Sequence, residues 1–232
     1  MNKKILVVAA HPDDEVLGIG GTVIKHTEDK DNVSCVILGQ GMLSRDKENQ
    51  TLELDTLQKD AKRSGKILGF DAMYFSVFPD NTFDTVSILS ITKEMEKYLE
   101  LIRPDIIYTH HPYDLNIDHQ RTFQAVLTAC RPCNKFCPKK IYTFETLSST
   151  EWQNKDYQIF APNVYINIEE VIEKKIIALQ CYTSEIRDYP HPRSVEGVRL
   201  LAQYRGLEVN LKYAEALKLV REIQTTPNGS KN

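Results

Sequence analysis

Two short polar clusters in this sequence combine the residue types that hold and use a divalent metal. The first is AHPDDE, residues 10–15, and the second is HHPYDLNIDH, residues 110–119. Zinc prefers imidazole nitrogen and carboxylate oxygen, and a catalytic zinc site keeps one position open for water. Two histidines and one carboxylate would meet that requirement, and a further carboxylate could act as general base on the activated water. The clusters therefore indicate metal-assisted hydrolysis.

Each cluster also has a plainer structural explanation. Asp13, Asp14 and Glu15 could simply be acidic residues at the positive N-terminus of a helix. Asp118 and His119 could be a helix N-cap followed by a solvated imidazole. These explanations account for single residues, but not for two such clusters that both follow apolar, strand-like runs. We therefore favour the metal site.

The apolar runs before the clusters are typical of strands buried on both faces of a parallel sheet. They are residues 4–10 (KILVVAA) and residues 105–109 (DIIYT). In doubly wound sheets, ligands bind beyond the carboxyl ends of the strands, and the first and fourth strands are neighbours in the common order. The two clusters are therefore expected to share one crevice.

The rest of the chain alternates between strand-like and helix-like segments. We expect further strands at residues 32–38, 72–78, 141–145 and 163–168, and helices at residues 15–29, 51–68, 85–102, 118–130, 169–180, 195–204 and 214–224. This rhythm predicts a doubly wound α/β fold, with a mostly parallel sheet and helices on both faces. Because no repeat or linker is found, residues 1–232 are expected to form a single domain with a disordered tail over about 225–232.

Composition excludes several classes of protein. The 29 basic and 32 acidic side chains give a net charge of −3, which argues against a nucleic-acid partner because such a partner requires a basic face. No apolar stretch approaches the roughly 20 residues that cross a bilayer, and the N-terminal run is shorter than the ~7–15 apolar residues of a signal peptide. Five cysteines, an odd number, favour a reducing compartment. Together these features predict a cytoplasmic protein without a membrane span.

Two further patterns look like sites but have plainer explanations. Cys130, Cys133 and Cys137 are spaced like part of a metal site, yet no fourth ligand is near in sequence. Reduced thiols at a helix end are the favoured interpretation, and a structural zinc or a disulfide is the alternative. The glycines within residues 18–21 do not complete a dinucleotide-binding pattern, because Val23 stands at its third glycine. Close packing of a helix on the sheet explains them better.

The two polar clusters resemble the motifs of the LmbE/PIG-L family of zinc-dependent N-acetylglucosaminyl deacetylases. AHPDDE is similar to the first family motif, including the Gly-rich helix after it, and DLNIDH, residues 114–119, is similar to a form of the second. The resemblance spans most of the chain. Weaker matches lie at residues 68–69, 79–80, 145, 191–194 and 205–206. The resemblance implies a Rossmann-like fold and hydrolysis of an N-acyl bond.

By this resemblance, three residues hold the metal and two act beside it. His11, Asp14 and His119 are the implied metal ligands. Asp13 is the implied general base, which returns the proton to the leaving amine, and Asp118 is the residue that orients a nearby imidazole. Zinc (Zn²⁺) is the implied metal, with Fe²⁺ or Mn²⁺ as alternatives because this donor set also admits them.

One position departs from the family pattern. Many members have a histidine three residues before the last metal-binding histidine, where it stabilises the oxyanion, and this chain has Asn116. An amide can donate a hydrogen bond to an oxyanion but cannot supply a proton. Either Asp13 works as both base and acid, or a second imidazole assists. His191 is the first candidate for that imidazole and His111 is the second, although a loop histidine between two prolines explains His191 almost equally well.

Residues that contact the substrate are also suggested. Asp80 matches a family position that contacts sugar hydroxyls, although an aspartate at a strand end could equally cap the next turn. Arg45 could hold an anionic group such as a phosphate. His111 and Glu145 are further candidates for substrate contacts.

The sequence thus predicts a zinc-dependent hydrolase that removes the N-acetyl group from a GlcNAc-like amino sugar, either nucleotide-linked or a glycoside. A metal-activated water attacks, with Asp13 as general base. The alternatives are a metal-dependent hydrolase of another N-acyl or phosphate-ester substrate, and a non-catalytic metal- or sugar-binding module. The expected partner is a small amino sugar. The oligomeric state stays open, a homo-oligomer included.

Overall fold

The computed structural model describes residues 2–40, 50–156 and 158–224. The strands are β1 (Lys4–Ala9), β2 (Asn32–Gly39), β3 (Ala72–Phe78), β4 (Ile106–His110), β5 (Lys140–Phe144), β6 (Val164–Asn167) and β7 (Ala214–Glu222). The helices are α1 (Asp14–Glu28), α2 (Gln50–Leu68), α3 (Ile88–Ile102), α4 (Ile117–Ala129), α5 (Ile172–Leu179) and α6 (Val195–Leu207), with a 3₁₀ turn, η2 (Thr150–Trp152).

The strands form a single seven-stranded sheet in the order β3-β2-β1-β4-β5-β7-β6. The first five of these strands run parallel, and β1 pairs with both β2 and β4. The predicted doubly wound, mostly parallel α/β fold is confirmed. The neighbouring positions of β1 and β4 bring the ends of both strands, and the polar clusters that follow them, to one edge of the sheet.

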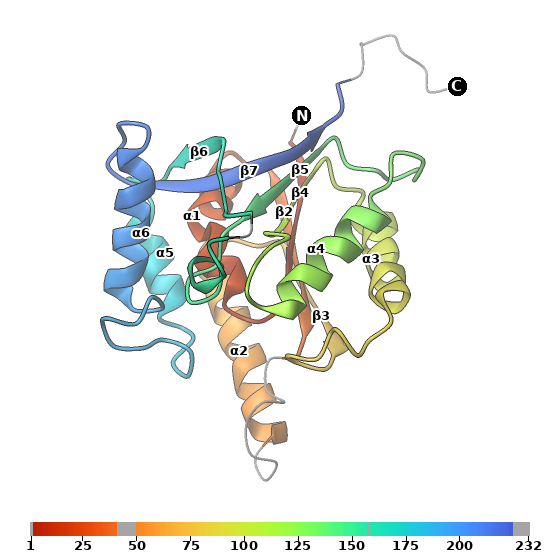
Figure 1. Ribbon diagram of the computed structural model, residues 1–232, viewed down its shortest axis with the longest axis horizontal. Coiled ribbons are helices and arrows are strands. Elements are labelled where there is room, and N and C mark those ends of the chain that lie inside the picture. Colours follow the sequence, from red (N-terminus) through yellow and green to blue (C-terminus); the bar gives the residue numbers. More distant parts are fainter. Residues whose placement is uncertain (1, 41–49, 157, 225–232) are drawn as a thin grey trace.

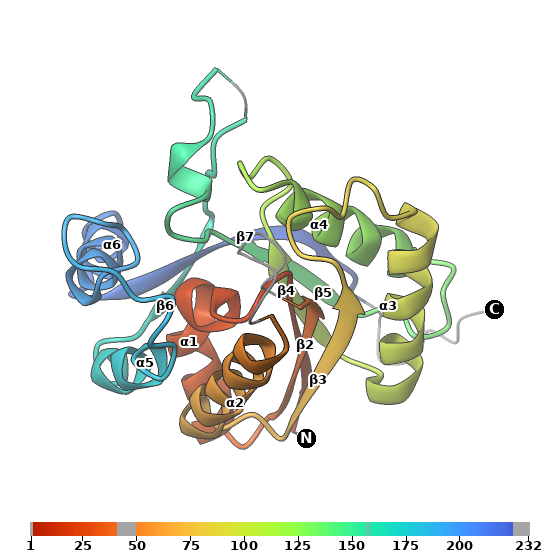
Figure 2. The same cartoon turned by 90° about the horizontal axis from the view of Figure 1, so that it is seen from below.

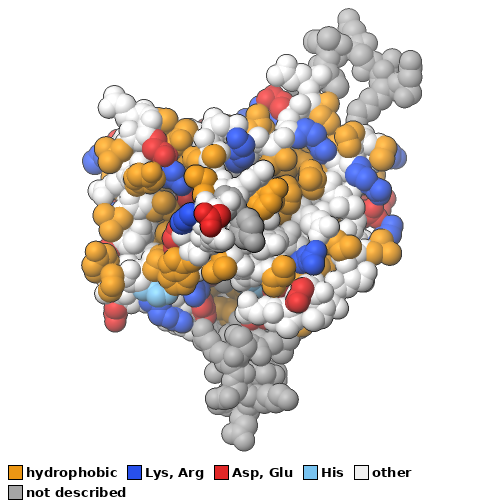
Figure 3. All heavy atoms as spheres, in the orientation of Figure 1, with side chains coloured by type: hydrophobic (Ala, Val, Ile, Leu, Met, Phe, Trp, Pro, Cys, Tyr) orange, Lys and Arg blue, Asp and Glu red, His pale blue; other side chains and the backbone are white. Residues whose placement is uncertain are grey.

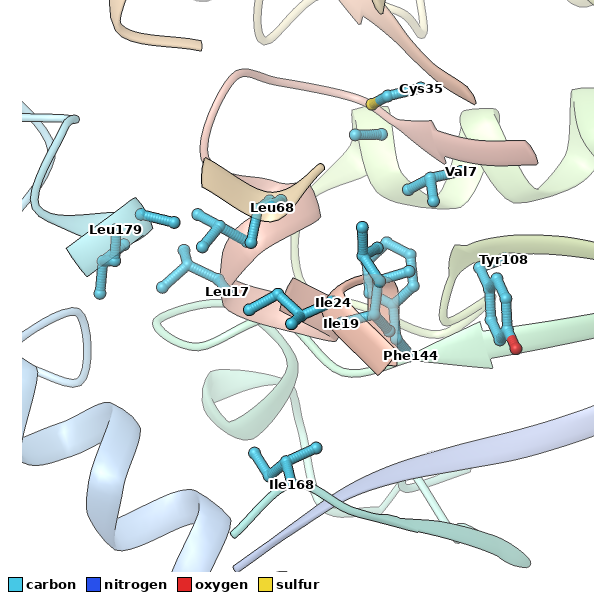
Figure 4. Close-up of a cluster of buried hydrophobic side chains, with 14 of the residues drawn as sticks. Val7, Leu17, Ile19, Ile24, Cys35, Leu68, Tyr108, Phe144, Ile168 and Leu179 are labelled. Carbon is cyan, nitrogen blue, oxygen red and sulfur yellow. The ribbon is translucent and has the colours of Figure 1, made fainter. Parts of the chain in front are cut away.

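Helices cover both faces of the sheet, and the two faces have separate cores (Figure 1). Alternate residues of β1 point to opposite sides: Ile5, Val7 and Ala9 join one cluster, while Leu6 and Val8 join the other. The first cluster lies under α1, α2, α5 and α6, and Figure 4 shows side chains from α1, α2 and α5 meeting those of the strands. The second cluster lies under α3 and α4. Because β1 is buried on both faces, the end of this strand is held rigidly.

The glycines at the start of α1 allow this helix to lie close to the sheet. A Cβ on Gly18 would overlap the ring of Phe144, and one on Gly21 would lie 2.7 Å from Cγ2 of Ile168. The interpretation of residues 18–21 as packing glycines is confirmed.

The prediction of a helix over residues 214–224 is wrong, because Ala214–Glu222 is strand β7. This strand runs antiparallel between β5 and β6 and pairs with both. Its residues include several good helix formers, such as Ala, Glu, Leu and Lys. Pairing on two sides and burial of its first half outweigh that intrinsic preference.

The cysteines are all free thiols, so the alternative of a disulfide among Cys130, Cys133 and Cys137 is wrong. Within the described residues, the groups that could hold a metal contain no cysteine. No described helix is both long and apolar enough to span a membrane. On the face drawn in Figure 3, basic and acidic side chains are interspersed among apolar ones.

Candidate metal centre and catalytic site

A polar cavity of about 200 Å³ opens where β1, β3, β4 and β5 end. It is lined by His11, Pro12, Asp13, Asp14, Leu17, Leu57, Asp80, Asn81, Asn116, His119, Thr146, Leu147, Ser148, Ser149, Glu185 and Arg193. The loops after β1 and β4 both contribute to it, as the sequence predicts. Both polar clusters therefore share one crevice at the carboxyl edge of the sheet.

His11, Asp14 and His119 form a compact set of metal-binding side chains. One donor atom from each lies within 4.8 Å of the others. The Oδ2 of Asp14 is 3.5 Å from Nδ1 of His11 and 3.3 Å from Nε2 of His119. Because two imidazole nitrogens and a carboxylate oxygen converge on one point, this set can hold a divalent cation.

A second set shares His11 and includes Asp80 and Asp118. The Nε2 of His11 lies 3.0 Å from a carboxylate oxygen of each aspartate. Asp118 also accepts backbone N–H bonds of 2.7 Å from Asn81 and 2.9 Å from Phe83. Its oxygens are thus already occupied, and the arrangement matches a carboxylate that orients a metal-binding imidazole. A proton on Nε2 of His11 leaves Nδ1 free to face Asp14.

His119 is oriented by a carboxylate in the same way. Its Nδ1 lies 3.1 Å from Oδ1 of Asp114. Both ring nitrogens of His119 are buried, and within the described part of the chain neither makes a well-directed hydrogen bond. Since the carboxylate favours the proton on Nδ1, the Nε2 lone pair is available to a metal. A buried imidazole nitrogen that faces the Asp14 carboxylate at 3.3 Å without a well-directed hydrogen bond is the clearest sign that the residues fit a metal ion.

The charges of the metal-binding set also favour a bound cation. Although burial opposes ionisation, contacts with Asp118, Asp14 and Asp80 raise the pKa of His11 well above its usual value. Burial likewise opposes a charge on His119, but Asp14 and Asp114 raise its pKa to about 9. In the absence of metal, protons would therefore occupy both rings, and a divalent cation would displace them.

His110 lies behind the metal-binding set and is neutral. Its Nε2 accepts a hydrogen bond of 2.9 Å from the backbone N–H of Ala10, and its ring stacks on that of His119 at 3.9 Å. Burial and the neighbouring His119 lower the pKa of His110 to about 4. His110 therefore supports the end of β1 and the ring of His119.

Asp13 projects into the cavity from a strained turn. Its φ of 101° is in the left-handed region, which non-glycine residues adopt rarely and often at functional sites. The Oδ2 of Asp13 accepts a hydrogen bond of 3.1 Å from Arg193, and its backbone N–H donates to buried Glu15. Burial and the charge of Asp14 raise the pKa of Asp13, while Arg193 opposes the rise. Asp13 is therefore a buried carboxylate suited to take up a proton.

Asn116 lines the cavity and caps helix α4. Its Oδ1 accepts the backbone N–H of Asp118 at 2.8 Å. That bond assigns the amide orientation and leaves Nδ2 as a donor, with only a long contact of 3.4 Å to Asn81. The amide can therefore donate a hydrogen bond into the cavity.

Three other sequence candidates do not line the cavity. His191 packs edge-on against Trp152, and Nε2 of His111 lies 3.3 Å from the carbonyl oxygen of Gln158. Glu145 accepts two hydrogen bonds of 2.7 Å from Arg205. None of the three is among the described residues that line the cavity. Arg45 lies outside the described residues.

Asp114, Arg193 and Glu15 have roles at the site that were not predicted from the sequence. Asp114 lies inside the second motif, and Arg193 lies in the weaker match at residues 191–194, so both could have been singled out. Glu15 is fully buried and accepts a hydrogen bond of 2.5 Å from Tyr182. Burial raises the pKa of Glu15 to about 7. Only the fold shows that these side chains support His119 and Asp13.

Comparison with known proteins gives both a family and a range of activities. The family described as PIG-L, GlcNAc-PI de-N-acetylase, matches residues 6–130. The chain is 26% identical over 189 residues to a probable N-acetyl-alpha-D-glucosaminyl L-malate deacetylase 2 of Bacillus anthracis, covering 79% of this chain and 81% of the relative. It is 26% identical over 231 residues to the diacetylchitobiose deacetylase of Thermococcus kodakarensis, covering 95% and 84%.

A solved structure with another activity has the same fold. The 4-carboxy-2-hydroxymuconate hydratase of Pseudomonas putida superimposes with a TM-score of 0.74 at 22% identity, covering 98% of this chain and 100% of that one. The fold alone therefore does not decide the reaction.

Proposed function

This chain belongs to the PIG-L family, and we propose on that premise that it is a metal-dependent N-deacetylase of an N-acetyl amino sugar. The observation that carries the proposal is the convergence of His11, Asp14 and His119 beside the buried carboxylate of Asp13. The donor set supports a divalent cation, and a spare carboxylate next to it is what amide hydrolysis requires.

Zinc is the metal we propose, because two imidazoles and one carboxylate form a typical catalytic zinc set. Nδ1 of His11, Oδ2 of Asp14 and Nε2 of His119 would hold it. When bound, zinc supplies Lewis-acid polarisation of the amide carbonyl and of a water molecule.

Asp13 moves the proton during hydrolysis. It takes a proton from the attacking water as the new C–O bond forms at the acetyl carbon. It then gives that proton to the sugar nitrogen as the C–N bond breaks, so that acetate and the amine leave. Arg193 stays hydrogen-bonded to Asp13 and holds its carboxylate in one orientation.

Asn116 is the residue we favour for oxyanion stabilisation. Its Nδ2 is a donor at the cavity wall, whereas His191 is not among the described residues that line the cavity. Since an amide supplies no proton, Asp13 acts as both base and acid.

The proposal is tested by metal analysis together with product assays. The zinc-loaded protein is incubated with N-acetylglucosamine, N,N′-diacetylchitobiose, p-nitrophenyl phosphate and 4-carboxy-2-hydroxymuconate. We expect one zinc per chain and acetate release from the acetylated sugars alone. Phosphate release, hydration of the dienoic acid, or metal binding without any turnover would each overturn the proposal in favour of a phosphoesterase, a hydratase or a binding module.

A further inference from the structure

Two loops meet at the rim of the cavity, and each carries an aromatic ring there. Ser149 lines the cavity from the loop after β5, and Arg193 lines it from the loop before α6. The backbone N–H of Trp152 donates to the carbonyl of Ser149 at 3.2 Å, and Nδ1 of His191 accepts the backbone N–H of Arg193 at 3.1 Å. Trp152 and His191 therefore lie just outside the cavity, one on each loop.

The two rings touch across the gap between the loops. Their centroids are 5.6 Å apart, with an interplanar angle of 82°. Trp152 is nevertheless 52% exposed, so a large part of the indole is open to solvent. Partial burial and the nearby Arg193 and Arg187 lower the pKa of His191, so its ring is neutral near pH 7. Together Trp152 and His191 form an uncharged aromatic shelf beside a polar cavity.

The aromatic shelf is fixed relative to the metal-binding set. Ser149 and Thr150 donate their hydroxyl groups to Asp114, the Thr150 bond being 2.5 Å long. The same carboxylate lies 3.1 Å from Nδ1 of His119. In Figure 2, the segment with η2 that follows β5 projects from the body of the molecule, yet its base is tied to the site by these bonds. These hydrogen bonds thus fix the position of Trp152 relative to the metal-binding set.

The charges that line the cavity restrict what can lie across the shelf. Arg193 is the only arginine or lysine among the described lining residues, and it already contacts Asp13 and Glu185. Asp14 and Asp80 add further carboxylates. A diphosphate linker inside the cavity would therefore meet four carboxylates, those of Asp13, Asp14, Asp80 and Glu185, and only one arginine among the described lining residues. A neutral sugar ring avoids that repulsion, and its face of C–H groups can pack on an exposed indole.

We infer that Trp152, with His191 behind it, binds a second, neutral sugar ring linked to the acetylated ring in the cavity. The substrate class is then a di- or oligosaccharide rather than a nucleotide-linked sugar. This inference rests on the proposed function, because it takes the acetylated ring to lie at the metal-binding set.

Binding can be followed directly, because Trp152 is the only tryptophan in the chain. Zinc-loaded Asp13→Asn protein is titrated with N,N′-diacetylchitobiose, N-acetylglucosamine or UDP-N-acetylglucosamine, with tryptophan emission as the signal. We expect the disaccharide to give a saturable shift to shorter wavelength, since stacking removes water from the indole. The monosaccharide should give a much smaller shift. Calorimetric binding of the disaccharide without an emission change, or a larger response to the nucleotide sugar, would overturn the inference.

Kinetics provide the second readout. Trp152→Ala is expected to lower kcat/KM for diacetylchitobiose about 10-fold more than for N-acetylglucosamine, mainly through KM, and Trp152→Phe should restore most of the difference. Leu89→Ala, which removes an exposed apolar side chain of α3, is the matched control. Equal losses on both sugars would contradict a role in binding the second ring.

The two proposals can fail separately. If the wild-type protein released acetate from neither sugar, the proposed function would fail, whereas the fluorescence titration would still test the aromatic shelf. If acetate were released from both sugars and Trp152→Ala left their ratio unchanged, the shelf would fail and the deacetylase proposal would stand.

Discussion

Arg193 donates a hydrogen bond of 3.1 Å to Oδ2 of Asp13, and the same nitrogen lies 3.2 Å from Glu185. This arginine reaches a carboxylate 180 residues earlier in the chain. Burial and the charge of Asp14 raise the pKa of Asp13, and Arg193 is the main group that opposes them. The contact therefore keeps a buried base available to accept a proton.

Replacing Arg193 should slow the reaction and shift its pH dependence. Without the guanidinium, the pKa of Asp13 rises further, so a higher pH is needed to deprotonate it. We expect Arg193→Gln to lower kcat/KM at pH 7 by about 10- to 100-fold and to move the rising limb of the pH profile to higher pH. Arg199→Gln, which breaks an exposed pair with Glu173, is the control. An unchanged pH profile would show that Arg193 does not act through Asp13.

Asp114 should affect metal affinity through His119. Its carboxylate lies 3.1 Å from Nδ1 of that ring, so it fixes the tautomer that leaves Nε2 for the metal. We expect Asp114→Asn to weaken zinc binding about 10- to 100-fold, measured by competition with a chelating dye. Asp84→Asn, at an exposed position, should bind zinc like the wild type. Equal zinc affinity in both variants would show that Asp114 does not support metal binding through His119.

His110 should make the metal-free protein less stable as the pH falls. Its pKa is about 4 in the folded chain and about 6.5 when unfolded. Its stabilising contribution is therefore complete above pH 6.5 and is lost as the pH falls toward 4, with a slope of up to about 1.4 kcal/mol per pH unit. Glu15, whose pKa is raised, changes stability in the opposite direction.

The comparison with His110→Gln isolates this effect, because glutamine can accept the Ala10 hydrogen bond but does not titrate. The free energy of unfolding of both proteins is measured by urea denaturation from pH 4.5 to 7.5, in the presence of a chelator. We expect the wild type to lose stability relative to the variant as the pH falls. A constant difference would contradict a neutral, buried His110.

Gly18 and Gly20 should respond differently to alanine. A Cβ at Gly18 would overlap the Phe144 ring, while one at Gly20 would lie 3.1 Å from a methyl group of Val16. Both substitutions replace a glycine of the same helix next to Ile19, so the difference between their free energies of unfolding mainly reports packing. We expect Gly18→Ala to be about 1–3 kcal/mol less stable than Gly20→Ala in urea denaturation. Equal stabilities would mean that α1 is not held this close to the sheet.

The sequence predicted well those parts of the fold in which local pattern and tertiary environment agree. The apolar runs that became β1 and β4 are buried on both faces, so their composition alone indicates a parallel sheet. Strand β7 has helix-forming residues and is a strand because β5 and β6 pair with it. No local pattern contains that information.

The same distinction applies to the site. His11, Asp14 and His119 lie in two short motifs, and the order of the strands brings them together. Arg193 contacts Asp13 only because the loop before α6 folds back over the cavity. Packing of His191 on Trp152 likewise depends on two loops that are distant in sequence. Contacts of this kind follow from the tertiary fold.

The central claim is that Asp13 moves the proton beside a metal held by its neighbours. Asp13→Asn is a conservative test, because asparagine tolerates the left-handed backbone at this position. In addition, Asp13 is not one of the proposed metal ligands. Zinc content and acetate release from N,N′-diacetylchitobiose are measured on the same samples of wild type and variant. We predict one zinc per chain in both proteins and a rate about 10²- to 10⁴-fold lower in the variant. A zinc-loaded variant that released acetate at the wild-type rate would contradict the account.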